Sequence, residues 1–392
     1  MLIKGAKALL TDGFDRVDVR TAGDVISEIG NDLTSDPGEE VIEASGKILT
    51  PGLIDMHAHT FTHGFHLALD ADVMSATSGV TTFLDAGSAG AVGFPSFYEF
   101  IIKKARSRMY AYLNISILGQ TISAFHDQSL QENDVRDLAH LPLAEEMLRR
   151  YPDVIKGLKV RVYPNMPGLY ALEQARHLAD KVGLPVMVHL GSAPPFAVDT
   201  LALLKRGDII THPYHGGTDT LLDEKGEIRE VFLEARARGI EVDLGMDRFH
   251  CDLSTMKKAF DQGFYPDYVS SDLTTLNIDE VTVDLPTCIS KCVACGMDLD
   301  VALQKATSQV AQKLGITDTV GQISVGHVAD LALFDWVDST EPLIDFFGNK
   351  ITEAKRLVHV LTIFGGERLR REGQQPKIWD STKRAVHWAN YD

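Results

Sequence analysis

The chain has 392 residues, of which 44% are hydrophobic and 24% charged, proportions that fit a folded protein and exclude a disordered chain, a collagen and a coiled coil. Its 38 basic and 55 acidic side chains give a formal net charge of −17, without a long basic run. This charge argues against a nucleic-acid partner, because clustered Lys and Arg bind phosphate backbones. A small anionic substrate is still allowed, since a metal or a buried arginine can supply local positive charge.

Residues 1–50 contain short apolar runs broken by Gly, Asp and Pro, which is typical of short antiparallel strands joined by turns. No apolar stretch approaches the roughly 18 residues of a membrane span, and the first residues lack the apolar core of a signal peptide. We expect a cytoplasmic protein with no membrane partner.

From residue 53, apolar β-rich runs alternate with segments of helical periodicity, a pattern that predicts repeated βα units and a parallel sheet. The predicted strands are 53–59, 80–85, 110–118, 155–162, 185–190, 208–212, 240–245 and 267–273. The predicted helices between them include 135–150, 171–182, 227–238 and 254–262. Eight strands favour a (β/α)8 barrel over an open sheet, and barrel active sites lie where the strands end.

The last part of the chain returns to short strands with Gly turns at 320–335 and 355–370, after a helical stretch at 298–314. We therefore expect both chain ends to build one β-module that flanks the barrel. The predicted division is 1–50 for the first part of this module, 51–319 for the barrel, and 320–392 for the second part with a C-terminal tail.

Potential metal ligands recur at the ends of the predicted barrel strands. His57 and His59 are two residues apart on the first strand, so both side chains point into the barrel mouth, although a hydrogen-bonded polar patch alone would also explain such a pair. Four further candidates end other strands: Lys159, His189, His212 and Asp272. Imidazole and carboxylate groups converging from separate strand ends predict a site for Zn or a similar divalent ion.

Together with these residues, three motifs resemble the amidohydrolase superfamily over nearly the whole chain: PGLIDMHAH at 51–59, GVTTFLDAG at 79–87 and VGHVADLALFD at 325–335. The resemblance implies a metal-bearing (β/α)8 barrel with a small β-sandwich made from both termini. It also implies two divalent metal ions, which we expect to be zinc.

The resemblance further implies a role for each candidate. His57, His59 and Asp272 would hold the more buried ion, and His189 and His212 the more exposed one.

Lys159 would bridge the two ions. Since an ammonium group cannot ligate a cation, the resemblance implies that Lys159 carries a carbamate formed with carbon dioxide, and a buried lysine loses its proton readily enough for this reaction. An ordinary strand-end lysine paired with an acidic residue is the alternative. With both ions in place, we expect a metal-bridging hydroxide to attack the substrate carbonyl. Asp272 is expected to move the proton from this hydroxide to the leaving group.

A finer likeness concerns the substrate. The runs DAGSAGAVGF at 85–94 and LNIS at 113–116 resemble the dihydroorotase-like subgroup, whose characterised members include deacetylases of N-acetyl and O-acetyl α-carboxylates. The glycines of the first run predict a flexible loop at the barrel mouth. The sequence departs from this subgroup at two places. Near the end of strand seven, similar proteins have a histidine where this chain has Gly-Met-Asp at 245–247, and His215 stands where they have an asparagine.

Three residues are candidates for substrate binding: Arg161, Tyr163 and His215. Arg161 shares a strand face with Lys159 and is the first candidate for a carboxylate anchor, because guanidinium and carboxylate form paired hydrogen bonds. Structural hydrogen bonding is the alternative role for each of the three.

The four cysteines do not indicate a second cofactor. Cys288, Cys292 and Cys295 have the spacing of one helix face, which favours buried free thiols over an iron–sulfur site, and three cysteines within eight residues make a poor disulfide framework. Free thiols indicate a reducing compartment.

We expect a binuclear hydrolase that deacetylates a small N-acetyl amino acid or O-acetyl hydroxy acid. The alternatives are a cyclic amide hydrolase of the dihydroorotase or hydantoinase type, an aminopurine deaminase and, from another class, a non-catalytic scaffold barrel. The expected partner is a small molecule, and a homo-oligomer is compatible with the sequence.

Overall fold

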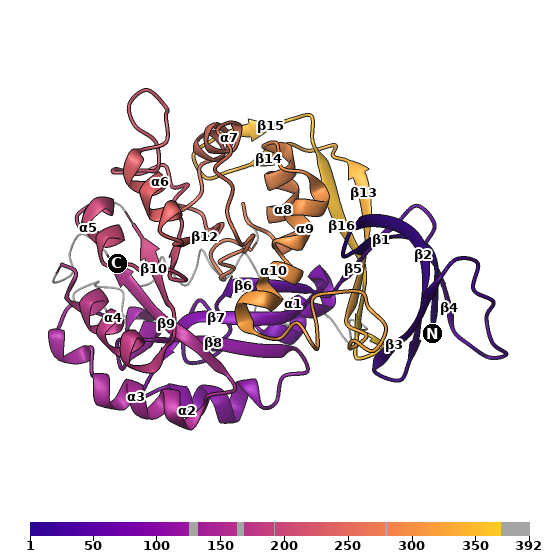
Figure 1. Cartoon of the computed structure of the whole chain (residues 1–392), viewed down its shortest axis with the longest axis horizontal. Coiled ribbons are helices and arrows are strands. Elements are labelled where there is room, and N and C mark those ends of the chain that lie inside the picture. Colours follow the sequence, from indigo (N-terminus) through magenta and orange to yellow (C-terminus); the bar gives the residue numbers. More distant parts are fainter. Residues whose placement is uncertain (125–131, 163–167, 192, 279–280, 370–392) are drawn as a thin grey trace, which may run out of the picture.

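The computed structural model describes residues 1–124, 132–162, 168–191, 193–278 and 281–369. A parallel sheet of seven strands lies at its centre, in the order β12-β11-β10-β9-β8-β7-β6 (Figure 1). The strands are β6 (Leu53–Ala58), β7 (Val80–Gly90), β8 (Arg108–Asn114), β9 (Ile155–Val162), β10 (Val186–Leu190), β11 (Ile209–Thr211) and β12 (Glu241–Asp243). Each corresponds to a predicted barrel strand, so the predicted barrel architecture is confirmed.

The eighth predicted strand, 267–273, closes the barrel without forming a regular ladder. Tyr268 bridges to Asp243 of β12 and Leu273 bridges to Ala58 of β6, both in parallel. Between these bridges the backbone of Asp272 is left-handed, with φ of +49°. Since a left-handed residue cannot continue a strand, the segment turns where it carries a candidate ligand.

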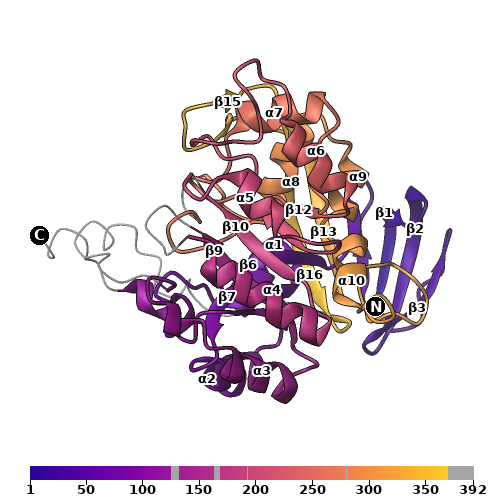
Figure 2. The ribbon, with the colours of Figure 1, turned by 60° about the vertical axis from the view of Figure 1, so that its left-hand side comes forward.

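Helices cover the outside of this sheet (Figure 2). They are α1 (Ala71–Ser78), α2 (Phe94–Phe97), α3 (Leu141–Arg150), α4 (Tyr170–Val182), α5 (Ala197–Ala202), α6 (Glu230–Ala237), α7 (Leu253–Asp261), α8 (Leu285–Ala294), α9 (Leu299–Gln304) and α10 (Ser308–Leu314). Helical turns of other types are the π-helical η1 (Tyr98–Ile102) and the 3-10 helices η2 (Gly119–Ala124) and η3 (Arg136–Leu138). The predicted helical stretch 298–314 is thus two helices. In the described part of the chain, every helix is too short or too polar to cross a lipid bilayer.

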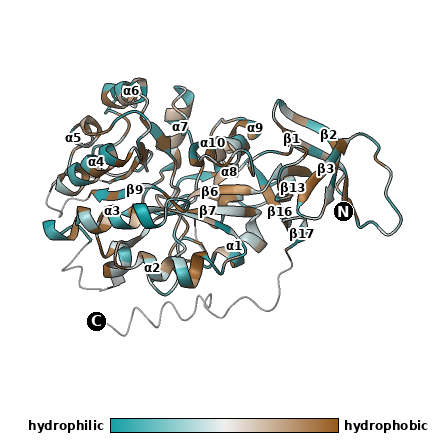
Figure 3. Ribbon diagram, turned by 60° about the horizontal axis from the view of Figure 1, so that its bottom comes forward, coloured by the Kyte–Doolittle hydropathy of each residue, from teal (hydrophilic) through white to brown (hydrophobic). Residues whose placement is uncertain are grey.

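The helices are amphipathic, as α4 illustrates. Leu172, Ala175 and Leu178 lie three residues apart and are buried against the sheet, and Gly183 ends the helix in a left-handed conformation. Polar residues occupy the outer faces of α3, α4 and α6 (Figure 3). Cys288 and Cys292 on α8 and Cys295 at its C-terminal end are buried and free, which confirms the prediction of a helix that carries core thiols.

Both ends of the described chain meet in one eight-stranded sheet of order β17-β16-β13-β5-β1-β2-β3, with β4 paired to β1. Its strands are β1 (Leu2–Leu10), β2 (Gly13–Ala22), β3 (Val25–Gly30), β4 (Val41–Glu43), β5 (Ile48–Pro51), β13 (Leu331–Asp338), β16 (Lys355–Phe364) and β17 (Glu367–Arg368). The junction is made by β5, which pairs with β1 on one side and with β13 on the other. A separate hairpin consists of β14 (Leu343–Ile344) and β15 (Lys350–Ile351). The prediction that both ends build one β-module is confirmed, whereas the division at residues 50/51 and 319/320 stays a prediction.

Candidate metal centre

A cavity of about 100 Å³ opens where the barrel strands end. Its lining includes most of the predicted ligands together with polar residues from several loops: His57, His59, Lys159, Arg161, His189, Asp247, His250, Asp272, Gln120 and Thr274. This position agrees with the rule that barrel active sites lie at the carboxyl ends of the strands.

His57, His59 and Asp272 form the first group of possible ligands. The Nε2 atoms of His57 and His59 lie 3.3 and 3.1 Å from the same oxygen, Oδ1 of Asp272. All three side chains are buried, and the ligand atoms lie within 4.8 Å of one another. Two imidazoles and a carboxylate at this separation fit one divalent cation.

The outward nitrogen of each of these rings has a partner of its own. The Nδ1 atom of His57 lies 2.9 Å from Oδ2 of Asp243, and Nδ1 of His59 lies 2.8 Å from Oγ of Ser88. Such outer hydrogen bonds fix the tautomer and the ring orientation of metal-binding histidines. They leave Nε2 of both rings facing Asp272.

His212 is oriented in the same way from β11. Its Nδ1 lies 2.8 Å from the carbonyl oxygen of Gly245, and its backbone is left-handed with φ of +71°. Strained backbone at a non-glycine residue is typical of functional sites. The Nε2 atom is buried and makes no hydrogen bond with the described residues, its charged neighbour being Asp272 Oδ2 at 3.6 Å. A buried nitrogen of this kind is suited to a cation.

Lys159 is buried on β9, with its Nζ 3.3 Å from Nε2 of His57. Burial lowers the pKa of its ammonium group to about 8. The charges of Asp272 and Asp243 act against this lowering of the pKa, although no carboxylate of the described residues forms a salt bridge with Lys159.

Gly87 allows Lys159 to pass close to β7. A Cβ atom at position 87 would lie 2.6 Å from both Cβ and Cγ of Lys159, and Gly87 has φ of +83°. The prediction of a flexible loop was wrong for Gly87 and Gly90, because both are buried in β7. Their small size serves close packing of the chain at these positions.

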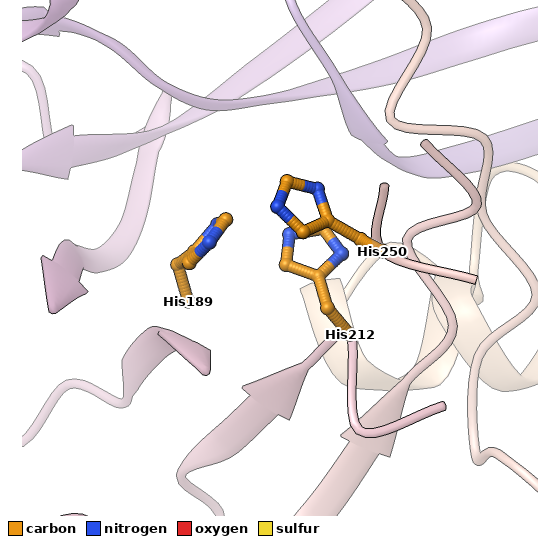
Figure 4. A group of neighbouring side chains, drawn as sticks. All are labelled: His189, His212 and His250. Atoms are coloured by element: carbon orange, nitrogen blue, oxygen red, sulfur yellow. The ribbon is translucent and has the colours of Figure 1, made fainter. Parts of the chain in front are cut away.

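A second group of imidazoles comprises His189, His212 and His250 (Figure 4). His189 comes from β10, and His250 comes from the loop that follows β12. Sequence reasoning missed His250. It lies five residues beyond the predicted strand 240–245, and no periodicity indicates where a loop residue will point.

The surroundings of three candidate ligands favour the neutral imidazole that metal binding requires. Burial lowers the pKa values of His57, His189 and His212 well below the usual value for histidine, and neighbouring positive groups lower them further. The neutral imidazole is the form that ligates metals. The donor types, their burial and their orientation therefore fit divalent cations.

The predicted substrate residues have different environments. Arg161 lines the cavity, and its Nη1 lies 3.1 Å from Oε2 of the buried Glu132. His215 is buried and accepts a hydrogen bond from the backbone N–H of Gly217, but it is not among the described residues that line the cavity. Burial lowers the pKa of His215 to about 4. Tyr163 lies outside the described residues.

Comparison with known proteins gives consistent results. The sequence profile of the amidohydrolase family matches residues 48–364. A deacetylase of Agrobacterium fabrum is 28% identical over 344 residues, which cover 87% of this chain and 83% of that protein.

Two solved structures are similar over most of their length. A dihydroorotase structure has a TM-score of 0.86 at 26% identity and covers 94% of this chain and 98% of its own. An adenine deaminase structure has a TM-score of 0.85 at 25% identity and covers 94% of this chain and 99% of its own.

Proposed function

Because the chain belongs to the amidohydrolase family, and is therefore a hydrolase, we propose that it is a binuclear metal enzyme that deacetylates a small N-acetyl amino acid or O-acetyl hydroxy acid. The observation that carries the proposal is the convergence of three overlapping groups of possible metal ligands, the third being Asp247, His250 and Asp272; all members except His212 line one cavity. The similarity to a deacetylase supports an acetyl group as the part removed.

The proposed ligands divide between two ions that we expect to be zinc. His57, His59 and Asp272 would hold the more buried ion, and His189 and His212 the more exposed one. Lys159, carrying a carbamate, would contact both. When bound, two such ions lower the pKa of a shared water toward neutrality and polarise the scissile carbonyl.

Asp272 is the proposed proton carrier. Its carboxylate lines the cavity and lies 3.1 Å from His59, so it can reach both the ligand cluster and a bound substrate. The side chain of Asn277 donates a hydrogen bond to the backbone carbonyl of Asp272 at 2.9 Å and so helps to hold this turn. We propose that Asp272 accepts a proton from the attacking water and delivers it to the leaving nitrogen or oxygen.

Arg161 is the proposed anchor for the substrate carboxylate. Arg161 lines the cavity, and its Nη1 donates a hydrogen bond to Oε2 of Glu132 at 3.1 Å, which holds the guanidinium beside the proposed ligands. A carboxylate held there would place the acetyl group toward the metal ligands.

The test is a hydrolysis screen of N-acetyl and O-acetyl α-carboxylates, in both stereochemical series, with the metal-loaded enzyme. Release of acetate by the wild type and its loss in Asp272→Asn, with the metal content retained, are the expected results. Near-normal turnover by a metal-loaded Asp272→Asn enzyme would contradict the role of this carboxylate.

A second candidate function is hydrolysis of a cyclic amide or deamination of an aminopurine. It is favoured by the similarity of the fold to a dihydroorotase and to an adenine deaminase. Ring opening or ammonia release, without release of acetate from any acetylated compound, would establish this second function and exclude the first.

A further inference from the structure

We propose that His250 is a third imidazole ligand of the more exposed metal ion and that Asp247 holds it in place. The inference rests on the proposed binuclear function and adds a ligand from the loop after β12, beyond the two histidines at the ends of β10 and β11. The sequence motifs assign no role to His250.

The geometry of three rings carries the inference. The ring centroids of His189 and His212 are 4.4 Å apart, those of His212 and His250 are 4.4 Å apart, and those of His189 and His250 are 4.6 Å apart. The ring of His250 is stacked on that of His212, at an interplanar angle of 29°, whereas His189 is edge-on to both rings, at 65° and 90° (Figure 4). One nitrogen from each ring lies within 4.8 Å of the other two. Three imidazole nitrogens this close together can serve as ligands of one divalent ion.

His250 is half-buried, unlike His189 and His212, which are buried. Its Nδ1 lies 3.0 Å from Oδ2 of Asp247, a close ion-pair contact without the geometry of a hydrogen bond, and its Nε2 is the nitrogen that we assign to the cluster. A carboxylate beside the outer nitrogen of a metal-binding histidine is a recurrent arrangement, and His57 has a hydrogen-bonded form of it with Asp243.

The side chain of Asp247 is held by Asn277, which also contacts the backbone of the proposed ligand Asp272. Asn277 donates one hydrogen bond to Oδ1 of Asp247 at 2.8 Å and another to the carbonyl oxygen of Asp272 at 2.9 Å. The side chain of Asn277 thus ties the segment that positions His250 to the turn that presents Asp272.

The loop that bears His250 is fixed at both ends. At its start, the carbonyl of Gly245 contacts His212 and the carbonyl of Met246 accepts a hydrogen bond from the hydroxyl of Thr282. At its end, the backbone N–H of Asp252 donates to the carbonyl of Tyr214 at 2.9 Å. An imidazole on such a loop is already in position before an ion binds, which lowers the entropic cost of binding.

A contact with substrate is the competing role for an imidazole at this position. The two roles differ in what they control. A ligand sets the affinity of the second ion in the absence of substrate, whereas a substrate contact changes KM and leaves ion binding unchanged.

The test compares Zn²⁺ binding to the wild type, His250→Ala and His250→Gln, measured by titration against a chromophoric chelator and by elemental analysis. His177→Ala is the matched control, because it removes an exposed histidine of α4 that is not among the described residues lining the cavity. We expect two ions in the wild type and the control, and in both His250 variants a second ion bound at least about 10-fold more weakly. Asp247→Asn should weaken the same ion by a smaller factor.

Two further readouts separate the outcomes. The visible absorption of the Co²⁺-loaded protein, which reports the coordination of the ion, should change in the His250 variants and not in the control. If either folded variant binds both ions with wild-type affinity and spectrum, His250 is not a ligand and the inference fails while the binuclear function stands. If the wild type binds no second ion, the inference and the proposed function fail together.

Discussion

Nδ1 of His57 lies 2.9 Å from Oδ2 of Asp243, which joins the first strand of the barrel sheet to the last. Asp243 is fully buried, and its other oxygen accepts a hydrogen bond from the hydroxyl of Ser270. The carboxylate therefore orients the ring that the first ion would need.

Asp243→Asn should weaken binding of the more buried ion by about 10–100-fold, because an amide carries no charge and fixes the ring tautomer less firmly. Zn²⁺ titration of the purified variant measures this change. Asp335→Asn is the control, since it removes a carboxylate that pairs with Lys47 at the eight-stranded sheet built by both chain ends. Equal ion affinity in the wild type and Asp243→Asn would show that this hydrogen bond does not support the site.

Gly245→Ala should damage the site through His212. The added Cβ would lie 2.5 Å from Nδ1 of His212 and 2.4 Å from Oγ1 of Thr211, and Gly245 has φ of +53°. We expect a lower melting temperature and loss of the more exposed ion. Gly263→Ala separates the two causes, because Gly263 has φ of +78° but a Cβ there would meet nothing within 4 Å. In Gly263→Ala the free energy of unfolding should fall only by the cost of the left-handed backbone, about 1–2 kcal/mol. The same effect of both substitutions on ion binding would contradict the packing argument.

Arg161→Met should raise KM for acetylated α-carboxylates at least about 10-fold, because the side chain loses charged hydrogen bonds worth roughly 1.5–3 kcal/mol. KM for the matching compound in which an amide replaces the carboxylate should change much less. Steady-state kinetics with this pair of substrates measures the difference. Removal of Arg161 also leaves the buried Glu132 without this partner, so the melting temperature must be recorded as well. An equal loss on both substrates would exclude a carboxylate anchor at Arg161.

His359, in the eight-stranded sheet built by both chain ends, should make the stability of the fold depend on pH. Burial lowers its pKa to about 4, and its Nε2 lies 2.8 Å from Oγ1 of Thr362, whose hydroxyl donates to the carbonyl of Ser75. The unfolded pKa is about 6.5, so between these values the unfolded chain binds more protons. The free energy of unfolding should therefore fall as the pH is lowered from about 6.5 toward 4.

His359→Gln should make this acid-induced fall smaller. Urea denaturation of the metal-free wild type and variant at pH 7.5, 6 and 5 measures it, and the other histidines act equally in both proteins. Curves for the two proteins that stay parallel across this range would show that His359 does not contribute.

Much of the fold could be predicted from the sequence because its strands are local apolar runs. β9 (Ile155–Val162) has the predicted bounds, and the other six strands of the sheet lie within or overlap their predicted ranges. The segment 267–273 could not be predicted as irregular, because the left-handed backbone of Asp272 depends on tertiary contacts.

The candidate site was predictable only where strand periodicity fixes the direction of a side chain. His57, His59, Lys159 and His189 lie on strands or at their ends, and they line the cavity as expected. His250 is on a loop, where direction depends on contacts with Asp247 and with distant segments. The outer carboxylate Asp243 was visible as part of a strand, but its pairing with a ring more than a hundred residues away was not.

A two-metal centre bridged by Lys159 is tested most directly by counting the metal ions per chain after metal removal and reconstitution with Zn²⁺, with and without bicarbonate. We expect two ions per chain, with full loading only when bicarbonate is present, because a carbamate on Lys159 would contact both. We also expect that Lys159→Arg does not reach two ions under either condition. A wild-type protein that binds no ion, or that binds two equally well without carbon dioxide, would contradict this assignment.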